Sequence, residues 1–270
     1  MVVGIGDNCV DRYPAPIRRT FAGGNVFNVV AQCLQHHHAA VYCGSVGDDA
    51  DGTLIRRELA RLGGSLRFLR VVPGGRTGVS RIAPGPDGEP RIIGEDYGVS
   101  GEPPLEPDLR ELLSRERPLV HLSTNGHALR VARFVEGIDA RLSCDFGYHL
   151  PDASPAATKE LLGRLTYAFI SVGDETTDAE ARRLSETVAR NGPRRVVVSR
   201  GRRGVVVWWD DTVAEAPAHP LSGPAVDTLG AGDALIAGML ASVDDGGTLA
   251  QHLDQGLRWA RDACLHPGAF

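Results

Sequence analysis

The residues with the clearest capacity for chemistry lie at 226–240, which read Val-Asp-Thr-Leu-Gly-Ala-Gly-Asp-Ala-Leu-Ile-Ala-Gly-Met-Leu. A glycine-rich turn runs here into an apolar helix, so the backbone N–H groups of Gly230, Ala231 and Gly232 are expected to be free at the helix start. The helix dipole adds positive potential, which makes the turn an anion site. Asp233 in the first turn is placed to take a proton from a hydroxyl group that attacks a bound phosphate. The segment predicts phosphoryl transfer.

The residues at 227–233 are more informative when they are considered together with a second pattern upstream. An isolated G-x-G-D is explained more simply as a helix cap. The whole string, however, resembles the C-terminal signature of the ribokinase-like (pfkB) carbohydrate kinases. Gly23-Gly-Asn-Val-Phe-Asn28 and Gly44-Ser-Val-Gly-Asp-Asp-Ala-Asp-Gly52 resemble other conserved elements of that family, in the right order. The resemblance covers essentially the full chain and implies a three-layer αβα fold with a mostly parallel sheet and a small β lid.

The resemblance also assigns a sugar site near the N-terminus. It implies that Asp11 binds hydroxyl groups of the substrate with help from Asp7. Gly23, Gly24 and Asn28 are the further substrate contacts that it implies. Carboxylates suit sugars because each accepts two hydroxyl hydrogen bonds, which its charge strengthens.

The nucleotide-binding residues are implied by the resemblance alone. Ser199, Gly201 and Gly204 match the family's strand and turn against which ATP lies, and Thr228 is assigned to the same ligand. Mg²⁺ is expected with ATP because it neutralises the transferring phosphate. Asp227 matches a position that helps to bind K⁺ in potassium-dependent members, and the sequence leaves open whether this chain needs that cation.

Two segments depart from the family pattern. Many relatives carry Asn-x-x-Glu near the Mg²⁺ water shell, whereas this chain has Asp174-Glu-Thr-Thr177 followed by Asp178. These acids either contact that shell or form an acidic first helical turn, which the dipole favours. Fructokinase-type members often read Asp-x-Asn-x-Arg, and Gly147 and His149 stand here at the Asn and Arg positions, so His149 is interpreted as a loop histidine.

Two other patterns are not interpreted as sites. Gly4-Ile-Gly6 could begin a dinucleotide fingerprint, but Cys9 stands where the third glycine is needed, and Pro14 and Pro16 prevent the following helix. The histidines at 36–38 cannot all face one ion from a helix, and no Cys or carboxylate cluster is near them in sequence. They are interpreted as a polar helix end.

Short apolar runs alternate along the chain with longer amphipathic ones, which is typical of an α/β domain with a mostly parallel sheet. Strands are expected at 2–6, 40–44, 118–122, 141–145, 167–171, 195–199 and 204–208. Apolar residues at helical spacing predict helices at 51–62, at 177–190 and around 249–260.

A small β-sheet is expected to project from this domain. Strands are expected at 76–83 and 90–94, joined by a turn at 84–88. Together with a short strand at 17–21 they are expected to form a lid over one end of the main sheet. The lid is therefore drawn from about 12–22 and 66–98 within a single kinase domain that spans 1–270. Members of the family often dimerise through such lids, which suggests a homodimer.

Composition excludes several other classes of protein. The chain has 270 residues and a net charge of −5, which leaves no overall basic field for a nucleic acid. Its five cysteines are odd in number and widely spaced, which indicates reduced thiols. No apolar run approaches the ~20 residues that cross a bilayer. We expect a soluble, cytoplasmic protein with neither a nucleic-acid nor a membrane partner.

The substrate is less well defined than the reaction. Gly6-Asp-Asn-x-Val-Asp-x-Tyr13 before Gly23-Gly-Asn25 most resembles the fructoselysine 6-kinase branch, which phosphorylates a fructose joined through C1 to an amino acid amine. Fructokinase, ribokinase or nucleoside kinase activity, or a silent sugar-binding relative, stay open as alternatives. Five unranked lid residues are candidates for specificity: Arg76, Thr77, Arg91, Glu95 and Tyr97.

Overall fold

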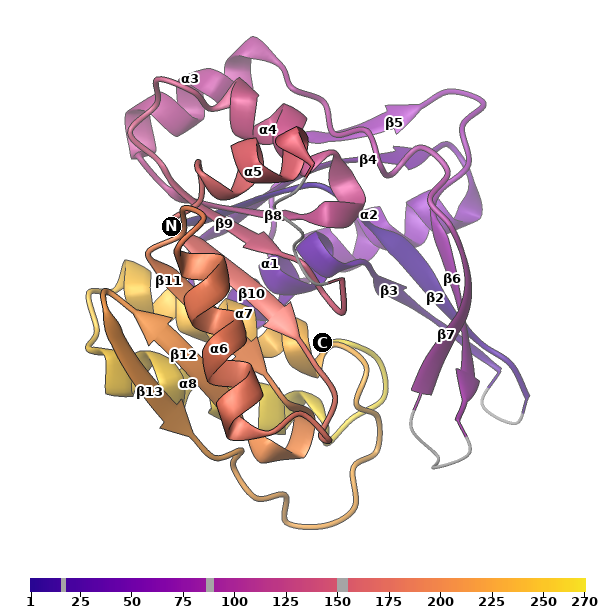
Figure 1. Cartoon of the computed structure of the whole chain (residues 1–270). Helices are drawn as coiled ribbons and strands as arrows, with labels where there is room; N and C mark the ends of the chain where they lie inside the picture. The colour runs from indigo at the N-terminus through magenta and orange to yellow at the C-terminus, as the bar shows by residue number, and fades with distance from the viewer. Residues whose placement is uncertain (16–17, 86–89, 150–154) are drawn as a thin grey trace. The chain divides into compact units, whose positions relative to one another are not determined.

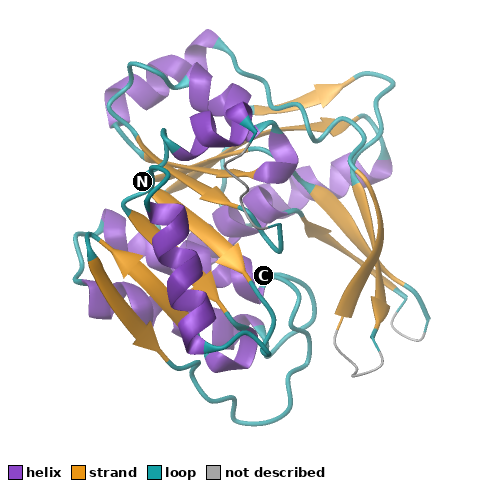
Figure 2. Ribbon diagram, in the orientation of Figure 1, coloured by secondary structure: helices purple, strands orange, loops and turns teal. Residues whose placement is uncertain are grey.

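The computed structural model describes residues 1–15, 18–85, 90–149 and 155–270. It has the expected α/β composition, with strands and helices alternating along most of the chain (Figures 1 and 2). The described chain divides into two compact units, one of residues 1–104 and 221–270 and one of residues 105–220. The expectation of one kinase domain over 1–270 stays a prediction.

Unit 1 contains three parallel strands in the order β1-β4-β5, at Val2–Ile5, Ala40–Gly47 and Leu69–Val72. Helix α1 (Asn25–Gln35) packs on β1 and β4, and helix α7 (Ala231–Asp244) packs between α1 and α8 (Leu249–Ala263). Helix α2 (Ala50–Arg61) packs against β4. The carboxylate of Asp49 starts α2 by accepting a 2.7 Å hydrogen bond from the Gly52 amide.

A second sheet of unit 1 has four strands in the order β3-β2-β6-β7. Their bounds are Arg19–Gly23, Cys9–Tyr13, Val79–Pro84 and Pro90–Asp96. Strand β2 pairs antiparallel with β3 and parallel with β6, and β6 pairs antiparallel with β7. The strand expected at 17–21 is β3, which runs two residues further toward the C-terminus. Residue 17, and residues 86–88 of the expected turn, lie outside the described residues.

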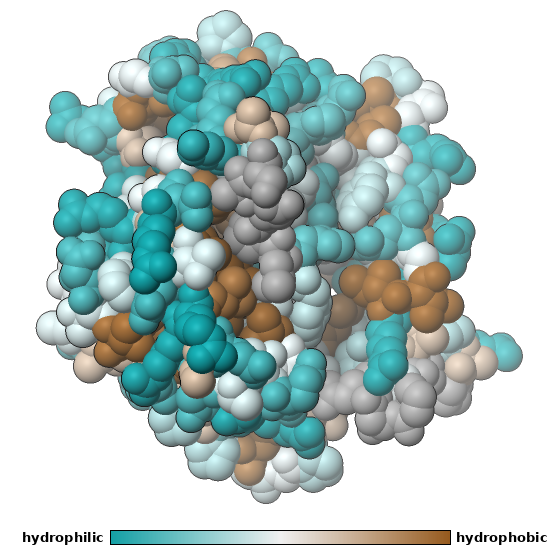
Figure 3. Space-filling view, viewed as in Figure 1, coloured by the Kyte–Doolittle hydropathy of each residue, from teal (hydrophilic) through white to brown (hydrophobic). Residues whose placement is uncertain are grey.

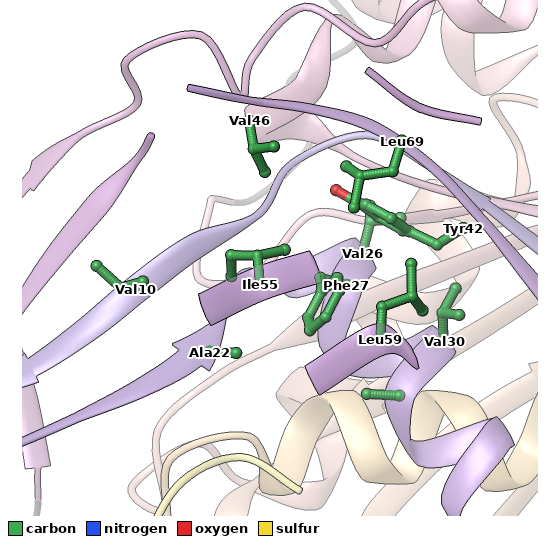
Figure 4. Packing of buried hydrophobic residues seen from close by; sticks show 11 residues of the cluster. Val10, Ala22, Val26, Phe27, Val30, Tyr42, Val46, Ile55, Leu59 and Leu69 are labelled. Carbon is green, nitrogen blue, oxygen red and sulfur yellow. The ribbon is translucent and has the colours of Figure 1, made fainter. Parts of the chain in front are cut away.

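One hydrophobic cluster anchors this second sheet to the helices (Figure 4). Val10 of β2 and Ala22 of β3 are buried in it together with Ile55 of α2. The rings of Phe27 and Tyr42 meet edge to face in the same cluster, with centroids 5.0 Å apart. Burial of Val10 and Ala22 fixes which face of β2 and β3 is turned toward α2, because side chains alternate along a strand.

Unit 2 has six strands in the order β13-β12-β11-β10-β9-β8. From β8 to β13 their bounds are Leu119–Ser123, Arg141–Asp145, Tyr167–Ser171, Arg195–Ser199, Val205–Trp209 and Thr212–Ala216. Neighbours are parallel from β8 to β11, and β12 and β13 are antiparallel. The helices are α3 (Pro107–Glu116), α4 (Ala128–Phe134), α5 (Ala156–Leu162) and α6 (Asp178–Ala189), with short 3₁₀ turns at Thr124–Gly126 and Gly201–Arg203.

The regular elements expected from apolar patterning are confirmed. All seven expected strands occur with ends shifted by three residues at most, and helices α2, α6 and α8 occupy the three expected helical stretches. Helix α6 begins with a capping box in which Thr177 and Glu180 exchange hydrogen bonds. Within the described ranges, no helix is both long and apolar enough to cross a membrane.

Candidate active site

The turn before α7 is built on glycine for a steric reason. Gly230 is the N-cap of the helix with a φ of 81°, a conformation that side chains disfavour. A Cβ added at this residue would lie 2.4 Å from the Cβ of Ala269. Gly232 differs, because a Cβ there would have no atom within 4 Å. Space next to the Gly232 backbone is therefore open to a ligand.

The hydrogen bonding of the backbone amides in this turn agrees only in part with the expectation. The Ala231 amide donates a 3.3 Å hydrogen bond to the carbonyl of Thr228, so the expectation that it is free is wrong. The cause is the turn itself, which closes through this bond before the helix begins. Across the described chain, the Gly232 amide has no hydrogen-bond acceptor. An anion beside Gly232 would satisfy that donor at the positive end of the 14-residue helix α7.

Asp233 is held by a residue from the other end of the sequence. Asn28, in the first turn and a half of α1, donates a 2.7 Å hydrogen bond from Nδ2 to Oδ2 of Asp233. Asn28 is only 4% exposed, and its Oδ1 is buried without a partner among the described residues. A buried acceptor costs free energy unless it is paired. A ligand hydroxyl group at Oδ1 would pair it, as the predicted sugar contact requires.

Asp7 serves as the cap of α1. Gly24 is the N-cap of that helix and has no side chain to bind the free amides. The buried Asp7 carboxylate accepts instead from the Asn25 amide at 2.8 Å and the Val26 amide at 3.4 Å. A Cβ at Gly24 would lie 2.4 Å from the Cα of Asn8, so glycine permits this close approach. A substrate contact by Asp7 or Gly24 stays a prediction.

Asp11 is a buried carboxylate on β2, 4% exposed. A Cβ at the neighbouring Gly23 would lie 2.0 Å from its Oδ2, so the carboxylate occupies the space that this glycine leaves. Burial raises the pKa of Asp11 to about 7, and the hydrogen bond from the Cys9 thiol opposes the rise. Nearby carboxylates add to the rise: Asp227, Glu95 and Asp7. Ionised Asp11 is costly in this setting unless hydrogen-bond donors or a cation reach it.

Asp227 has protein partners on both carboxylate oxygens. Oδ2 accepts from the Tyr13 hydroxyl at 2.6 Å and from the Gly268 amide at 3.0 Å. Oδ1 accepts from the Leu229 amide at 3.0 Å. These bonds connect β2 to the turn before α7, a role that no sequence pattern predicts. They do not favour Asp227 as a ligand of a monovalent cation, and that role stays a prediction.

The residues assigned to the nucleotide lie in unit 2, except for Thr228. Ser199 ends β11, and its hydroxyl donates to Ser171 Oγ at 3.2 Å. Gly201 and Gly204 flank the short turn before β12 with φ values of 49° and 85°. The three residues are thus grouped on one strand-to-strand turn, as expected for that motif. Their contact with a nucleotide stays a prediction.

Arginines of the same turn bind the acids that follow β10. Arg202 donates to Asp174 from Nε at 2.9 Å, and Arg203 donates to Asp178 from Nη2 at 2.7 Å. Asp178 also pairs with Arg200, which is 3% exposed. Asp178 lies in the first turn of α6, as the simpler interpretation expected. Asp174 and Asp178 thus pair with arginines, and Asp178 also belongs to an acidic first helical turn. A place of these acids in the water shell of Mg²⁺ stays a prediction.

The histidine motifs lie where the simpler interpretations placed them. His149 is exposed in the loop after β9. His36 stacks on Trp259 with ring centroids 3.9 Å apart. Carboxylates from another part of the chain lie near His38: Asp244 and Asp245, at the end of α7, are 3.1 Å and 3.7 Å from its ring nitrogens. These carboxylates are close to His38 in space although they are distant in sequence.

Solved kinases share this architecture. Arabidopsis thaliana ribokinase complexed with ribose and ATP has a TM-score of 0.80 at 21% identity, over 99% of this chain and 93% of that chain. A putative ribokinase II from E. coli, in complex with ATP and Mg²⁺, has a TM-score of 0.80 at 18% identity, over 99% of this chain and 94% of that chain. The fold is the ribokinase-like three-layer αβα fold with a mostly parallel sheet and a small β lid.

Sequence comparison identifies the family. Fructoselysine 6-kinase of Escherichia coli K12 is 30% identical over 268 residues, which cover 98% of each chain. Residues 15–270 match the pfkB family carbohydrate kinases, and the chain belongs to that family. It is a phosphotransferase with an alcohol group as acceptor.

Proposed function

We propose that this enzyme transfers a phosphoryl group from ATP to a primary hydroxyl group of a sugar-amine, in the manner of a fructoselysine 6-kinase. The observation that carries the proposal is the hydrogen bond from Asn28 to Asp233 beside the open amide of Gly232. The bond joins the proton acceptor at the start of α7, beside an amide that can bind an anion, to Asn28 of α1. The Oδ1 atom of Asn28 has no partner within the described residues and can accept a sugar hydroxyl.

Each of these residues has a distinct task. Asp233 takes the proton of the attacking hydroxyl group, and a positioned base contributes roughly 10²- to 10⁴-fold to the rate. Asn28 orients Asp233 through Nδ2 and accepts a sugar hydroxyl at Oδ1. Asp11 accepts further hydroxyl hydrogen bonds. The Gly232 amide, at the positive end of α7, stabilises negative charge on the transferring group, as main-chain donors do in anion holes.

The phosphoryl donor that we propose is ATP with Mg²⁺, which supplies the leaving group and offsets phosphate charge. The open space at Gly232, and its amide, which has no acceptor in the described part of the chain, fit the anionic end of such a donor. We assign its nucleoside part to Ser199, Gly201, Gly204 and Thr228. The three hydrogen bonds on Asp227 give a K⁺ site there no support.

One observation favours a sugar-amine over a neutral sugar or a nucleoside. The face of the lid sheet that carries Asp11 also carries Glu95, so the proposed sugar site is acidic. Fructokinase, ribokinase and nucleoside kinase activities are the alternatives. A catalytically silent relative is a weaker candidate, because the base and the open amide are both retained.

A substrate panel tests the proposal. Fructoselysine, fructose, ribose and adenosine are each offered with ATP and Mg²⁺, and ADP release and product mass are measured. We expect the highest kcat/KM with fructoselysine and phosphate on its C6 oxygen. Preferred turnover of a nucleoside would contradict the substrate assignment. Sugar binding without turnover of any compound would favour the silent relative.

The proposed enzyme is a cytoplasmic homodimer that pairs through its lid sheets. Strand β7 is last in the order of that sheet, so one side of it has no strand partner in the described chain. Ile92 and Ile93 of β7 are 51% and 67% exposed, and Figure 3 shows hydrophobic surface over β6 and β7. Sedimentation velocity would give a dimer for the wild type and a monomer for Ile93→Glu, whereas a wild-type monomer would contradict this arrangement.

A further inference from the structure

The register of the lid sheet places three polar side chains in one row. Asp11 of β2 lies opposite Ser80 of β6, and Ser80 lies opposite Glu95 of β7. The irregularity in the pairing of β6 and β7 falls after Arg81, so it does not disturb this row. Residues directly opposite each other in paired strands share a face. Asp11, Ser80 and Glu95 therefore share one face of the sheet.

The opposite face is identified by its packing. Val10 is buried in the hydrophobic cluster with Ile55 of α2, and Val79 packs against the same cluster. Arg12 forms an ion pair with Asp51 of α2. Because side chains alternate, Asp11, Ser80 and Glu95 face away from α2. Tyr13 lies on the same side as Asp11 and reaches Asp227 at the turn before α7, so this face is turned toward the proposed active site.

Glu95 is held in place by its neighbour on the same face. The Tyr97 hydroxyl donates a 3.0 Å hydrogen bond to Oε2 of Glu95. Tyr97 is 38% exposed, so the pair borders solvent, whereas Asp11 is almost fully buried. The charge of Glu95 acts on the carboxyl group of Asp11 and on the Tyr97 hydroxyl.

Two further observations concern the ligand: one indicates a hydrogen-bond donor and the other a positive charge. The buried Oδ1 of Asn28 lacks a hydrogen-bond donor within the described residues, which indicates that a ligand belongs at this site. Glu95 adds a second negative charge near Asp11, and like charges are unfavourable unless a cation offsets them. A neutral sugar supplies hydroxyl donors but no such charge. A sugar with a protonated amine supplies both.

We propose that Glu95, positioned by Tyr97, binds the protonated amine of the acceptor and thereby selects sugar-amines over neutral sugars. The inference rests on the proposed kinase function and names the residue that sets its substrate class. It also ranks the lid candidates. Arg76 pairs with Asp96, which as the neighbour of Glu95 in β7 lies on the opposite face, and Thr77 is bonded to Asp49.

The test compares acceptors that differ in charge at one position. 1-Amino-1-deoxyfructose carries an ammonium group where fructose carries a hydroxyl group, and fructoselysine carries a secondary amine there. For Glu95→Gln we expect kcat/KM to fall about 10- to 100-fold with both amines, and to change less than about threefold with fructose. Tyr97→Phe should also lower kcat/KM with both amines, by a smaller factor. Asp96→Asn, on the other face of the same strand, is the matched control and should leave all three values unchanged.

Two results would overturn the inference. One is an equal loss for amines and fructose, which would mean that Glu95 supports the fold and not selectivity. The other is no loss for the amines. Calorimetric binding of 1-amino-1-deoxyfructose and fructose to wild type and Glu95→Gln gives the same selectivity without turnover. If no acceptor is phosphorylated but the amine preference and its loss in Glu95→Gln persist in binding, the proposed kinase function fails and this inference stands.

Discussion

Asn28 and Asp233 are 205 residues apart in sequence and are joined by a 2.7 Å hydrogen bond between Asn28 Nδ2 and Asp233 Oδ2. The bond connects the start of α1 with the first turn of α7. The side-chain oxygen of Asn28, Oδ1, has no hydrogen-bond partner within the described residues. One side chain can thus orient the base and hold the hydroxyl group that the base deprotonates.

Replacing Asn28 by Asp should shift the pH dependence of the reaction. A second carboxylate at hydrogen-bond distance from Asp233 disfavours ionisation of the pair, so the apparent pKa that governs the base should rise. The acidic limb of the kcat profile should therefore move to higher pH by about one unit or more. Rates measured from pH 5 to 9 check this. An unmoved limb with a uniformly lower rate would mean that Asn28 does not contact the base during turnover.

Two glycines of the same turn should respond in opposite ways to alanine. Gly232→Ala should fold normally, because its Cβ meets no atom within 4 Å, but its methyl group should enter the anion site and lower kcat/KM at least about tenfold. Gly230→Ala should lose about 1–3 kcal/mol of stability, since its φ is 81° and Ala269 is in the way. Thermal denaturation and kinetics of both variants separate the two effects. Equal destabilisation by the two substitutions would contradict the conclusion that Gly232 borders open space whereas Gly230 is packed against Ala269.

Asp11 should make the free enzyme less stable as the pH rises. Its folded pKa of about 7 is above the ordinary value of 3.8 for an aspartate, so its stabilising contribution is complete below about pH 4 and is lost as pH rises through 7. At about 1.4 kcal/mol per pKa unit, a rise of about three units corresponds to a loss of roughly 4 kcal/mol. Asp11→Asn should therefore be more stable than wild type by a margin that widens from pH 5 to pH 8, and should bind sugar more weakly. Urea unfolding at several pH values measures the margin. A margin that is constant or narrows would contradict the raised pKa.

Apolar patterning sufficed to predict much of the fold. Residues 196–198 and 205–207 are runs of valine, and the strands that contain them lie where those runs predict. Strand β13 was not predicted, because Thr212–Ala216 is only partly buried and lacks a strong apolar run. Asp11, Asn28 and Asp233 were found through motifs that resemble a family, and not through patterning.

Contacts between distant segments could not be predicted. Neither the bond from Asn28 to Asp233 nor that from Tyr13 to Asp227 leaves a periodic signal in the sequence. The arginine partners of Asp174 and Asp178 also come from a turn well downstream. For the same reason Glu95 could not be ranked among the lid residues before the strand register placed it in line with Asp11.

The central claim is that Asp233 is the base for phosphoryl transfer, and Asp233→Asn tests it most directly. The variant keeps the size and the hydrogen-bonding capacity of the side chain, and Asp245→Asn, at the 68% exposed C-cap of the same helix, is the control. Single-turnover rates with saturating acceptor and calorimetric binding of the acceptor are measured together. The account predicts a rate lower by roughly 10²- to 10⁴-fold with acceptor affinity within about threefold of wild type, and no change in the control. Lost acceptor binding with an unchanged rate of the bound complex would contradict it.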